Sequence, residues 1–116
     1  IDALIVSNTT LERPSTLKSS HAGEAGGLSG APLKPFAQKA LEAAAEAAAG
    51  RLPLIAVGGI ESGTDAYARI RAGASAVQIY SALIYGGPGL VGAIKRDLAA
   101  RLRADGFAHI SEAVGR

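Results

Sequence analysis

Small and polar residues stand directly after two apolar, strand-like runs of this sequence. Gly58 and Gly59 follow one run, and Tyr80 and Ser81 end and follow the next. Two glycines let the backbone approach an anion closely, and a helix starting just after them adds free N–H groups with positive potential. Tyr80 and Ser81 would supply two further main-chain donors. The combination predicts a phosphate site, although a glycine pair alone is also typical of a plain tight turn.

The amide of Asn8 is the second group with binding chemistry. Asn8 follows the apolar run Ala3–Val6, and its side chain offers two donors and an acceptor in one plane. That set suits a carboxylate or imide ligand, but such a residue also caps or ties down loops, and Thr9 and Thr10 carry the same two interpretations. The glycine-rich segment Gly26–Gly30 either brings backbone close to a flat ligand or is a flexible connector.

Alternating strands and helices must position these groups. Apolar runs of the kind buried on both faces of a parallel sheet predict strands at Ala3–Val6, Pro53–Val57 and Ala76–Tyr80. Helical spacing and capping residues predict helices from Pro32 to Gly50, from Ser62 or Thr64 to Gly73, and from Leu90 to near Gly106, with one more turn near Ser111. The βαβαβα order implies parallel strands with right-handed crossovers. We interpret it as the last three βα units of a (β/α)8 TIM barrel, and an open doubly wound sheet gives a similar local pattern.

A long polar, glycine- and serine-rich stretch separates the first strand from the first helix. It runs from Ser7 to Gly30. Loops of this length inside a compact domain are uncommon, and most are lids or binding loops.

The composition excludes several classes of protein. Twelve basic and ten acidic residues leave a net charge of only +2, and without a basic stripe or an aromatic platform we expect no nucleic-acid partner. There is no cysteine, and no histidine has a second ligand at metal spacing, so no metal site is expected. No run is long enough to cross a bilayer. The chain begins at Ile1 and contains no methionine, so we expect it to be part of a longer protein.

Four segments, in this order and at these spacings, resemble the C-terminal part of the dihydroorotate dehydrogenase family: Ser7–Thr10, Gly26–Leu33, Leu54–Ile60 and Ala72–Ser81. The likeness extends from about Ile1 to about Gly106, and it is strongest to the quinone-dependent class, mainly through the loop 11–30. The resemblance implies that residues 1–116 are the C-terminal portion of an FMN-binding barrel domain. It implies an enzyme that oxidises dihydroorotate to orotate in pyrimidine synthesis.

The resemblance also implies roles for particular residues on the substrate and flavin side. Asn8 and Thr9 are expected to contact dihydroorotate or orotate. Ser7 is expected to lie against the flavin, and Gly30 is expected to give its backbone to the cofactor.

The remaining implied roles are those of phosphate binding. Gly59, Tyr80 and Ser81 are expected to hold the FMN phosphate through main-chain N–H groups. No catalytic residue is expected in this chain, because the family's base is a serine in a loop that precedes the matching segment. The quinone site and the helices that dock on the cytoplasmic side of the cell membrane also belong to the family's N-terminal region, so we expect this chain alone to be inactive.

Two other functions stay open on the residues alone. One is a different phosphate-binding barrel enzyme, such as an isomerase or a synthase. It would share Gly58 and Gly59 but would not need Asn8, Thr9 and the segment Gly26–Gly30. The other is a non-catalytic fragment or interaction domain.

Overall fold

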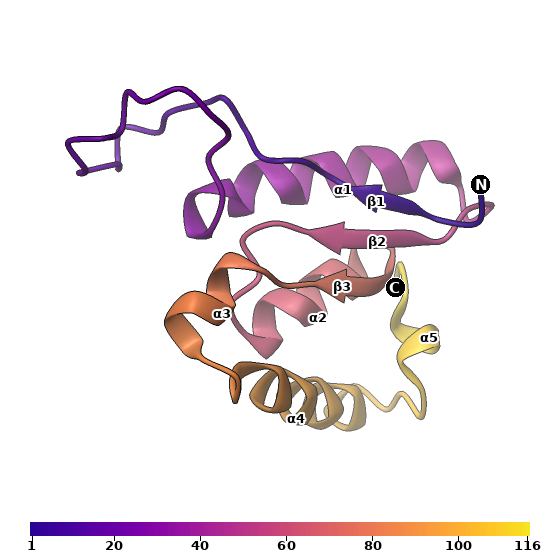
Figure 1. Cartoon of the computed structure of the whole chain (residues 1–116). Helices are drawn as coiled ribbons and strands as arrows, with labels where there is room; N and C mark the ends of the chain where they lie inside the picture. Colours follow the sequence, from indigo (N-terminus) through magenta and orange to yellow (C-terminus); the bar gives the residue numbers. More distant parts are fainter.

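A three-stranded parallel sheet with helices packed against it forms the body of the molecule (Figure 1). The computed structural model describes residues 1–116. Its strands lie in the order β1-β2-β3 and comprise β1 (Leu4–Val6), β2 (Leu54–Val57) and β3 (Ala74–Gln78). Its helical elements are η1 (Ala31–Leu33), α1 (Lys34–Ala48), α2 (Gly63–Arg71), α3 (Ser81–Gly86), α4 (Leu90–Ala104) and α5 (Ile110–Ala113). The predicted alternation of parallel strands and helices is confirmed.

The register of the sheet brings the carboxyl ends of all three strands to one edge. Val6 pairs with Ala56, and Val57, the last residue of β2, pairs with Gln78, the last residue of β3. Parallel strands joined by helices must all run the same way, so the segments that follow them emerge side by side. This edge is where a parallel α/β sheet carries its ligands.

The core lies between the sheet and the helices. Leu41 of α1, Leu54 and Ala56 of β2, and Ala66 and Ile70 of α2 are each at most 2% exposed and belong to one cluster. Alternation along β2 places its other residues on the opposite face, where they are only partly buried. That half-covered face is expected for a segment of a closed barrel, whose inner surface is filled by all eight strands together.

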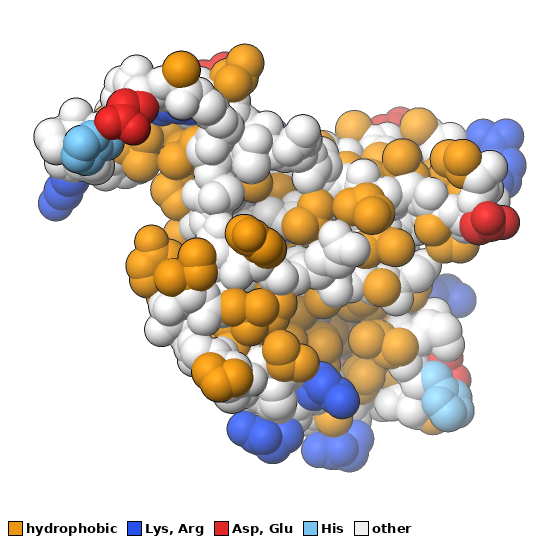
Figure 2. All heavy atoms as spheres, viewed as in Figure 1, with side chains coloured by type: hydrophobic (Ala, Val, Ile, Leu, Met, Phe, Trp, Pro, Cys, Tyr) orange, Lys and Arg blue, Asp and Glu red, His pale blue; other side chains and the backbone are white.

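The outer strands leave apolar surface uncovered. β1 and β3 each pair only with β2, and Ile5 of β1 is 53% exposed. Ile84 and Tyr85 of α3 are 75% and 87% exposed. Figure 2 shows hydrophobic side chains gathered over the sheet and α3 on this face, with Lys and Arg side chains below them over α4. Three strands cannot close a sheet, so two sheet edges stay open.

The predicted cap of α2 is confirmed, whereas α1 is shorter at each end than predicted. The Ser62 side chain caps α2 by accepting a hydrogen bond of 3.1 Å from the Asp65 N–H, so Ser62 and not Thr64 is the cap. Pro32 lies in η1, a turn of 3-10 helix that leads into α1. α1 ends at Ala48, and Ala49 and then Gly50 adopt positive φ angles.

The third strand differs from the prediction. It runs from Ala74 to Gln78 rather than from Ala76 to Tyr80, and Tyr80 lies outside it as the residue before α3. The Leu83 N–H donates to the Tyr80 carbonyl at 3.0 Å, which starts a helical turn that the sequence analysis did not predict. The apolar, β-branched run through this region is equally compatible with strand and helix, and only tertiary packing decides between them.

The stretch Ser7–Gly30 projects from the sheet as one long excursion (Figure 1). Thr10 and Leu28 form an isolated antiparallel bridge that closes its base. The Arg13 guanidinium holds its interior together by donating to five main-chain carbonyls, those of Leu11, Glu12, Ala22, Glu24 and Gly26. The loop therefore has internal order of its own. None of the helices in the molecule has both the length and the apolar character needed to span a bilayer.

Candidate functional site

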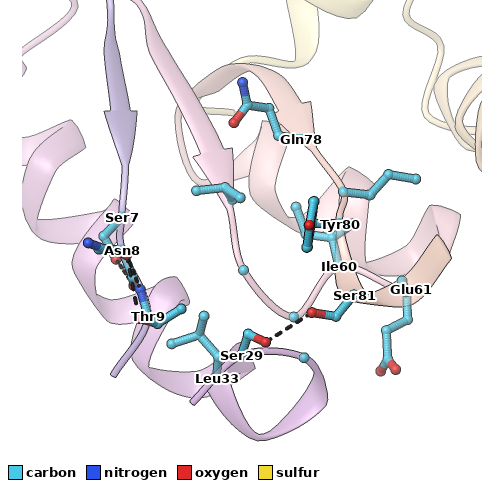
Figure 3. Close-up of a pocket in the computed structure, with 16 residues that line it drawn as sticks. Ser7, Asn8, Thr9, Ser29, Leu33, Ile60, Glu61, Gln78, Tyr80 and Ser81 are labelled. Atoms are coloured by element: carbon cyan, nitrogen blue, oxygen red, sulfur yellow. Dashed lines mark hydrogen bonds between the residues drawn. The ribbon is translucent and has the colours of Figure 1, made fainter. Parts of the chain in front are cut away.

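A cavity of about 200 Å³ opens at the carboxyl ends of the three strands (Figure 3). Its walls come from the end of β1, the segment before η1, the β2–α2 loop and the β3–α3 turn. All seven residues predicted to bind ligand line it: Ser7, Asn8, Thr9, Gly30, Gly59, Tyr80 and Ser81. The fold thus brings together positions that lie far apart in the sequence, and in particular Gly59 and Ser81 face a common space. Which ligand they hold stays a prediction.

Free main-chain donors characterise the wall formed by β2 and β3. The N–H groups of Gly59 and Tyr80 donate to no main-chain acceptor. The hydroxyls of Ser81 and Ser29 lie 3.0 Å apart and close this side of the cavity (Figure 3). Unpaired N–H groups at the rim of a cavity require water or an anionic ligand as acceptor. This wall therefore suits a phosphate.

The glycine pair also has a packing role that the sequence did not indicate. Gly58 and Gly59 have φ angles of 108° and 67°, which favour glycine. A Cβ on Gly58 would lie 2.8 Å from Cδ2 of Leu33, and a Cβ on Gly59 would lie 2.6 Å from Cα of Lys34. Lys34 does not line the cavity, so a side chain at position 59 would collide with the start of α1.

The opposite wall carries the Asn8 amide. Asn8 Oδ1 accepts hydrogen bonds from the Thr9 N–H at 2.8 Å and from the Thr9 hydroxyl at 3.4 Å. The Asn8 Nδ2 group has no partner in the chain, so two donors remain for a ligand. The loop-tying interpretation of Asn8 is therefore confirmed for its oxygen, and ligand binding through its free nitrogen stays a prediction.

Thr9 owes its position to a glycine in the segment 26–30. A Cβ on Gly27 would overlap the Thr9 hydroxyl, so the absence of a side chain there admits Thr9. Gly30 has a φ of 76° and lines the cavity beside Ser81. One glycine of this segment therefore accommodates a neighbouring side chain, and another borders the space for a ligand.

One cation pairs with two carboxylates on the outer side of the β2–α2 loop. Glu61 lines the cavity, and its carboxylate lies 3.4 Å from Lys34 Nζ, which also lies 3.0 Å from Asp65 Oδ1. Burial by itself would lower the pKa of Lys34, but the hydrogen bonds and charges of Asp65 and Glu61 raise it. Lys34 therefore stays charged and offsets the Glu61 carboxylate, which would otherwise oppose an anion in the cavity.

Asp65 shows the counterpart of that effect. Burial favours a higher pKa for its carboxyl, but hydrogen bonds from Lys34, from the Ser62 hydroxyl and from the Glu61 N–H lower it. The Asp65 carboxylate accepts hydrogen bonds from the Glu61 N–H and the Ser62 hydroxyl, and it lies in the first turn of α2, so it ties the loop to the start of that helix. These contacts fix the segment 58–65 from behind.

Sequence reasoning gave no individual role to four polar residues in or behind the site, although one of them, Ser29, lies in the segment Gly26–Gly30. Ser29 and Gln78 line the cavity, and so does Glu61. Gln78 is the one amide in an otherwise apolar run, which is a usable signal. Arg69 lies behind the loop and is 2% exposed. Arg69 follows the buried Ala66 by three residues, which places it on the inward face of α2. A basic residue at an inward-facing position was the signal in the sequence that could have identified it.

Comparisons with known proteins converge on one family. The sequence model described as "Dihydroorotate dehydrogenase" matches residues 1–102. A relative named dihydroorotate dehydrogenase (quinone) from Rhodospirillum rubrum is 64% identical over 99% of this chain and 31% of its own length. One of the same name from Xanthobacter autotrophicus is 60% identical over 99% of this chain and 32% of its own length. The chain thus spans about a third of the length of the curated relatives it matches.

Solved structures give the same result for the fold. A ligand-free dihydroorotate dehydrogenase from Eimeria tenella superposes with a TM-score of 0.93 at 46% identity, over 98% of this chain and 32% of that chain. The same enzyme in complex with ferulenol superposes with a TM-score of 0.94 at 45% identity, over 99% of this chain and 31% of that chain.

Proposed function

Because this chain belongs to the dihydroorotate dehydrogenase family, we propose that it is part of an enzyme that oxidises dihydroorotate to orotate in pyrimidine synthesis. Its parallel strands are the last three βα units of a TIM barrel, and the open doubly wound sheet is set aside. We take residues 1–116 to be the C-terminal portion of the barrel domain. The observation that carries the proposal is the family match together with seven expected binding residues around one cavity.

We assign the cavity to part of an FMN site. The free N–H groups of Gly59 and Tyr80, together with the N–H of Ser81 at the start of α3, fit the oxygens of a phosphate. Ser7 and Gly30 lie along the same cavity and would border the flavin. The volume of about 200 Å³ is below the range usual for a whole ligand, so other strands of the barrel would supply the remaining walls. When bound, the flavin supplies the electron acceptor for the oxidation.

We assign Asn8 and Thr9 to the substrate. The Asn8 Nδ2 group offers two donors to the carboxylate or a ring carbonyl of dihydroorotate, and the bond from Thr9 to Asn8 Oδ1 fixes the plane of the amide. The role of these residues is to bind and orient.

We assign no catalytic base to this chain. The titratable side chains in the cavity are those of Glu61 and Tyr80. Glu61 is paired with Lys34 on the outer side of the loop, and Tyr80 is 80% exposed. Neither is placed beside Asn8 and Thr9 by a hydrogen bond. As the family resemblance implies, we propose that the base is a serine from another part of the full-length enzyme, and we expect this chain alone to be inactive.

The electron acceptor follows from the relatives. They are named for quinone, so we propose a quinone as the acceptor and a peripheral position at the cytoplasmic side of the cell membrane. Both contacts would involve parts of the enzyme outside these residues.

Anaerobic reduction tests the proposal directly. The purified full-length protein should show a flavin absorption band, and excess dihydroorotate should bleach it in the absence of oxygen. In the same experiment, heat should release the cofactor from the protein, and the released cofactor should be FMN and not a dinucleotide. If the protein purifies without flavin, or if dihydroorotate does not reduce its flavin, the result would favour the alternative of a phosphate-binding isomerase or synthase.

A further inference from the structure

Arg69 is the one charged residue of the chain that is almost completely buried, with 2% exposure. Its Nη2 donates to the carbonyl oxygens of Gly58 and Lys34, both at 3.0 Å, and its Nη1 has no partner. Burial lowers the pKa of Arg69, and the charges of Asp65 and Glu42 oppose this effect. The ordinary pKa of an arginine is so high that the guanidinium nevertheless stays charged. Burying a charge in this way costs stability that an apolar side chain would not. This cost indicates that Arg69 has a role beyond packing.

The geometry of the peptide unit supplies that role. The carbonyl of Gly58 and the N–H of Gly59 belong to one planar trans peptide, so they point in opposite directions. Arg69 holds the oxygen on the side of α2. The N–H is thereby directed away from α2, and Gly59 borders the cavity with that N–H free.

A peptide between two glycines needs such a restraint. Gly58 and Gly59 both have positive φ angles, and neither has a Cβ to oppose rotation of the peptide that joins them. Rotation by half a turn would present the Gly58 carbonyl oxygen to the cavity and repel an anion. A hydrogen bond from a charged donor is stronger than one between neutral groups, so the guanidinium holds the attractive orientation.

We propose that Arg69 is a positioning residue for anion binding, whose guanidinium fixes the Gly58–Gly59 peptide with its N–H facing the cavity. The inference rests on the proposed function, because it takes the anion to be the phosphate of FMN. The second bond, to the Lys34 carbonyl, ties the same guanidinium to the first turn of α1, against which Gly59 packs. Arg69 thus joins the three segments that set the position of the loop.

Paired titrations with FMN and riboflavin test the inference. Riboflavin has the same ring system and lacks the phosphate, so the ratio of the two dissociation constants reports on the phosphate site alone. The full-length apoenzyme and its Arg69→Met variant are titrated with each ligand by quenching of flavin fluorescence. We expect the variant to bind FMN about 10- to 100-fold more weakly, with riboflavin affinity unchanged within about twofold.

Two further variants separate positioning from stability. Arg69→Lys keeps a cationic donor on a long stem and should retain most of the preference for FMN. Arg71→Met, on the same helix, removes the ion pair with Asp105 at the far side of α2 and should lower the thermal midpoint without changing the ratio. If Arg69→Met does not accumulate as folded protein, the Arg69→Gln variant is used instead. The glutamine side chain is polar but too short to reach the Gly58 carbonyl, so it also removes the restraint.

Three results would overturn the inference or its premise, and they are distinguishable. Wild-type affinity for both FMN and riboflavin in the Met or Gln variant would refute the positioning role. An equal loss of FMN and riboflavin affinity would show that Arg69 acts only on stability. A wild-type enzyme that binds FMN no more tightly than riboflavin would refute the phosphate site itself, whatever Arg69 does.

Discussion

Replacing Gly59 with alanine should destabilise the protein through a collision with helix α1. Gly59 has a φ of 67°, and a Cβ there would lie 2.6 Å from Cα and 2.7 Å from N of Lys34. These are backbone atoms at the start of a helix, so they cannot turn aside as the end of a side chain would. Either the β2–α2 loop or the first turn of α1 must move.

The size of the effect follows from two contributions. An alanine in the left-handed region costs about 1–2 kcal/mol in conformational energy. Forcing an additional carbon into a packed region costs about 1–3 kcal/mol more. We expect Gly59→Ala to lower the free energy of unfolding by about 2–5 kcal/mol.

Gly50→Ala is the matched control. Gly50 has a similar φ of 74°, but a Cβ there would meet nothing within 4 Å. It should therefore show the conformational contribution alone, about 1–2 kcal/mol. Equilibrium unfolding in urea, performed on the full-length apoprotein, measures both variants without interference from flavin.

The difference between the two variants is the informative quantity. Equal destabilisation by Gly59→Ala and Gly50→Ala would mean that the contact with Lys34 is not as tight as the structure has it. Loss of flavin affinity in Gly59→Ala with stability at the Gly50→Ala level would instead indicate that the new methyl group meets the phosphate.

Three other substitutions probe the rest of the chain. Asn8→Ala should raise the KM for dihydroorotate about tenfold while flavin content stays normal, because a ligand oxygen loses its Nδ2 donors; unchanged steady-state kinetics would exclude Asn8 from the substrate site. Arg13→Ala should speed amide hydrogen exchange across residues 11–28, since five carbonyls lose their shared donor, whereas Lys18→Ala in the same loop should not. Asp65→Asn should reduce stability at neutral pH and lose that deficit in acid. The pKa of Asp65 is held below its ordinary value of 3.8, so its contribution is present above that pH and disappears as the pH falls through the lowered pKa. A deficit that persists in acid unfolding curves would contradict this account.

The sequence by itself determined the elements whose signals are local. Ser62 caps α2 through a residue three positions away, and the buried strands follow from short apolar runs. The glycine break after β2 likewise depends only on neighbouring residues. The resemblance of four short motifs was enough to name seven residues that line one cavity, because their order and spacing identify the family without reference to packing.

Tertiary structure alone decided the end of the third strand and the environment of the loop. Tyr80 left the strand because a helical turn forms at α3, and the apolar sequence permits either structure. The reason for glycine at position 59 lies in Lys34, which is 25 residues earlier in the chain. The partners of Arg69 are carbonyls 11 and 35 residues away. Contacts of this kind depend on how whole elements pack, and no local pattern of residue types encodes them.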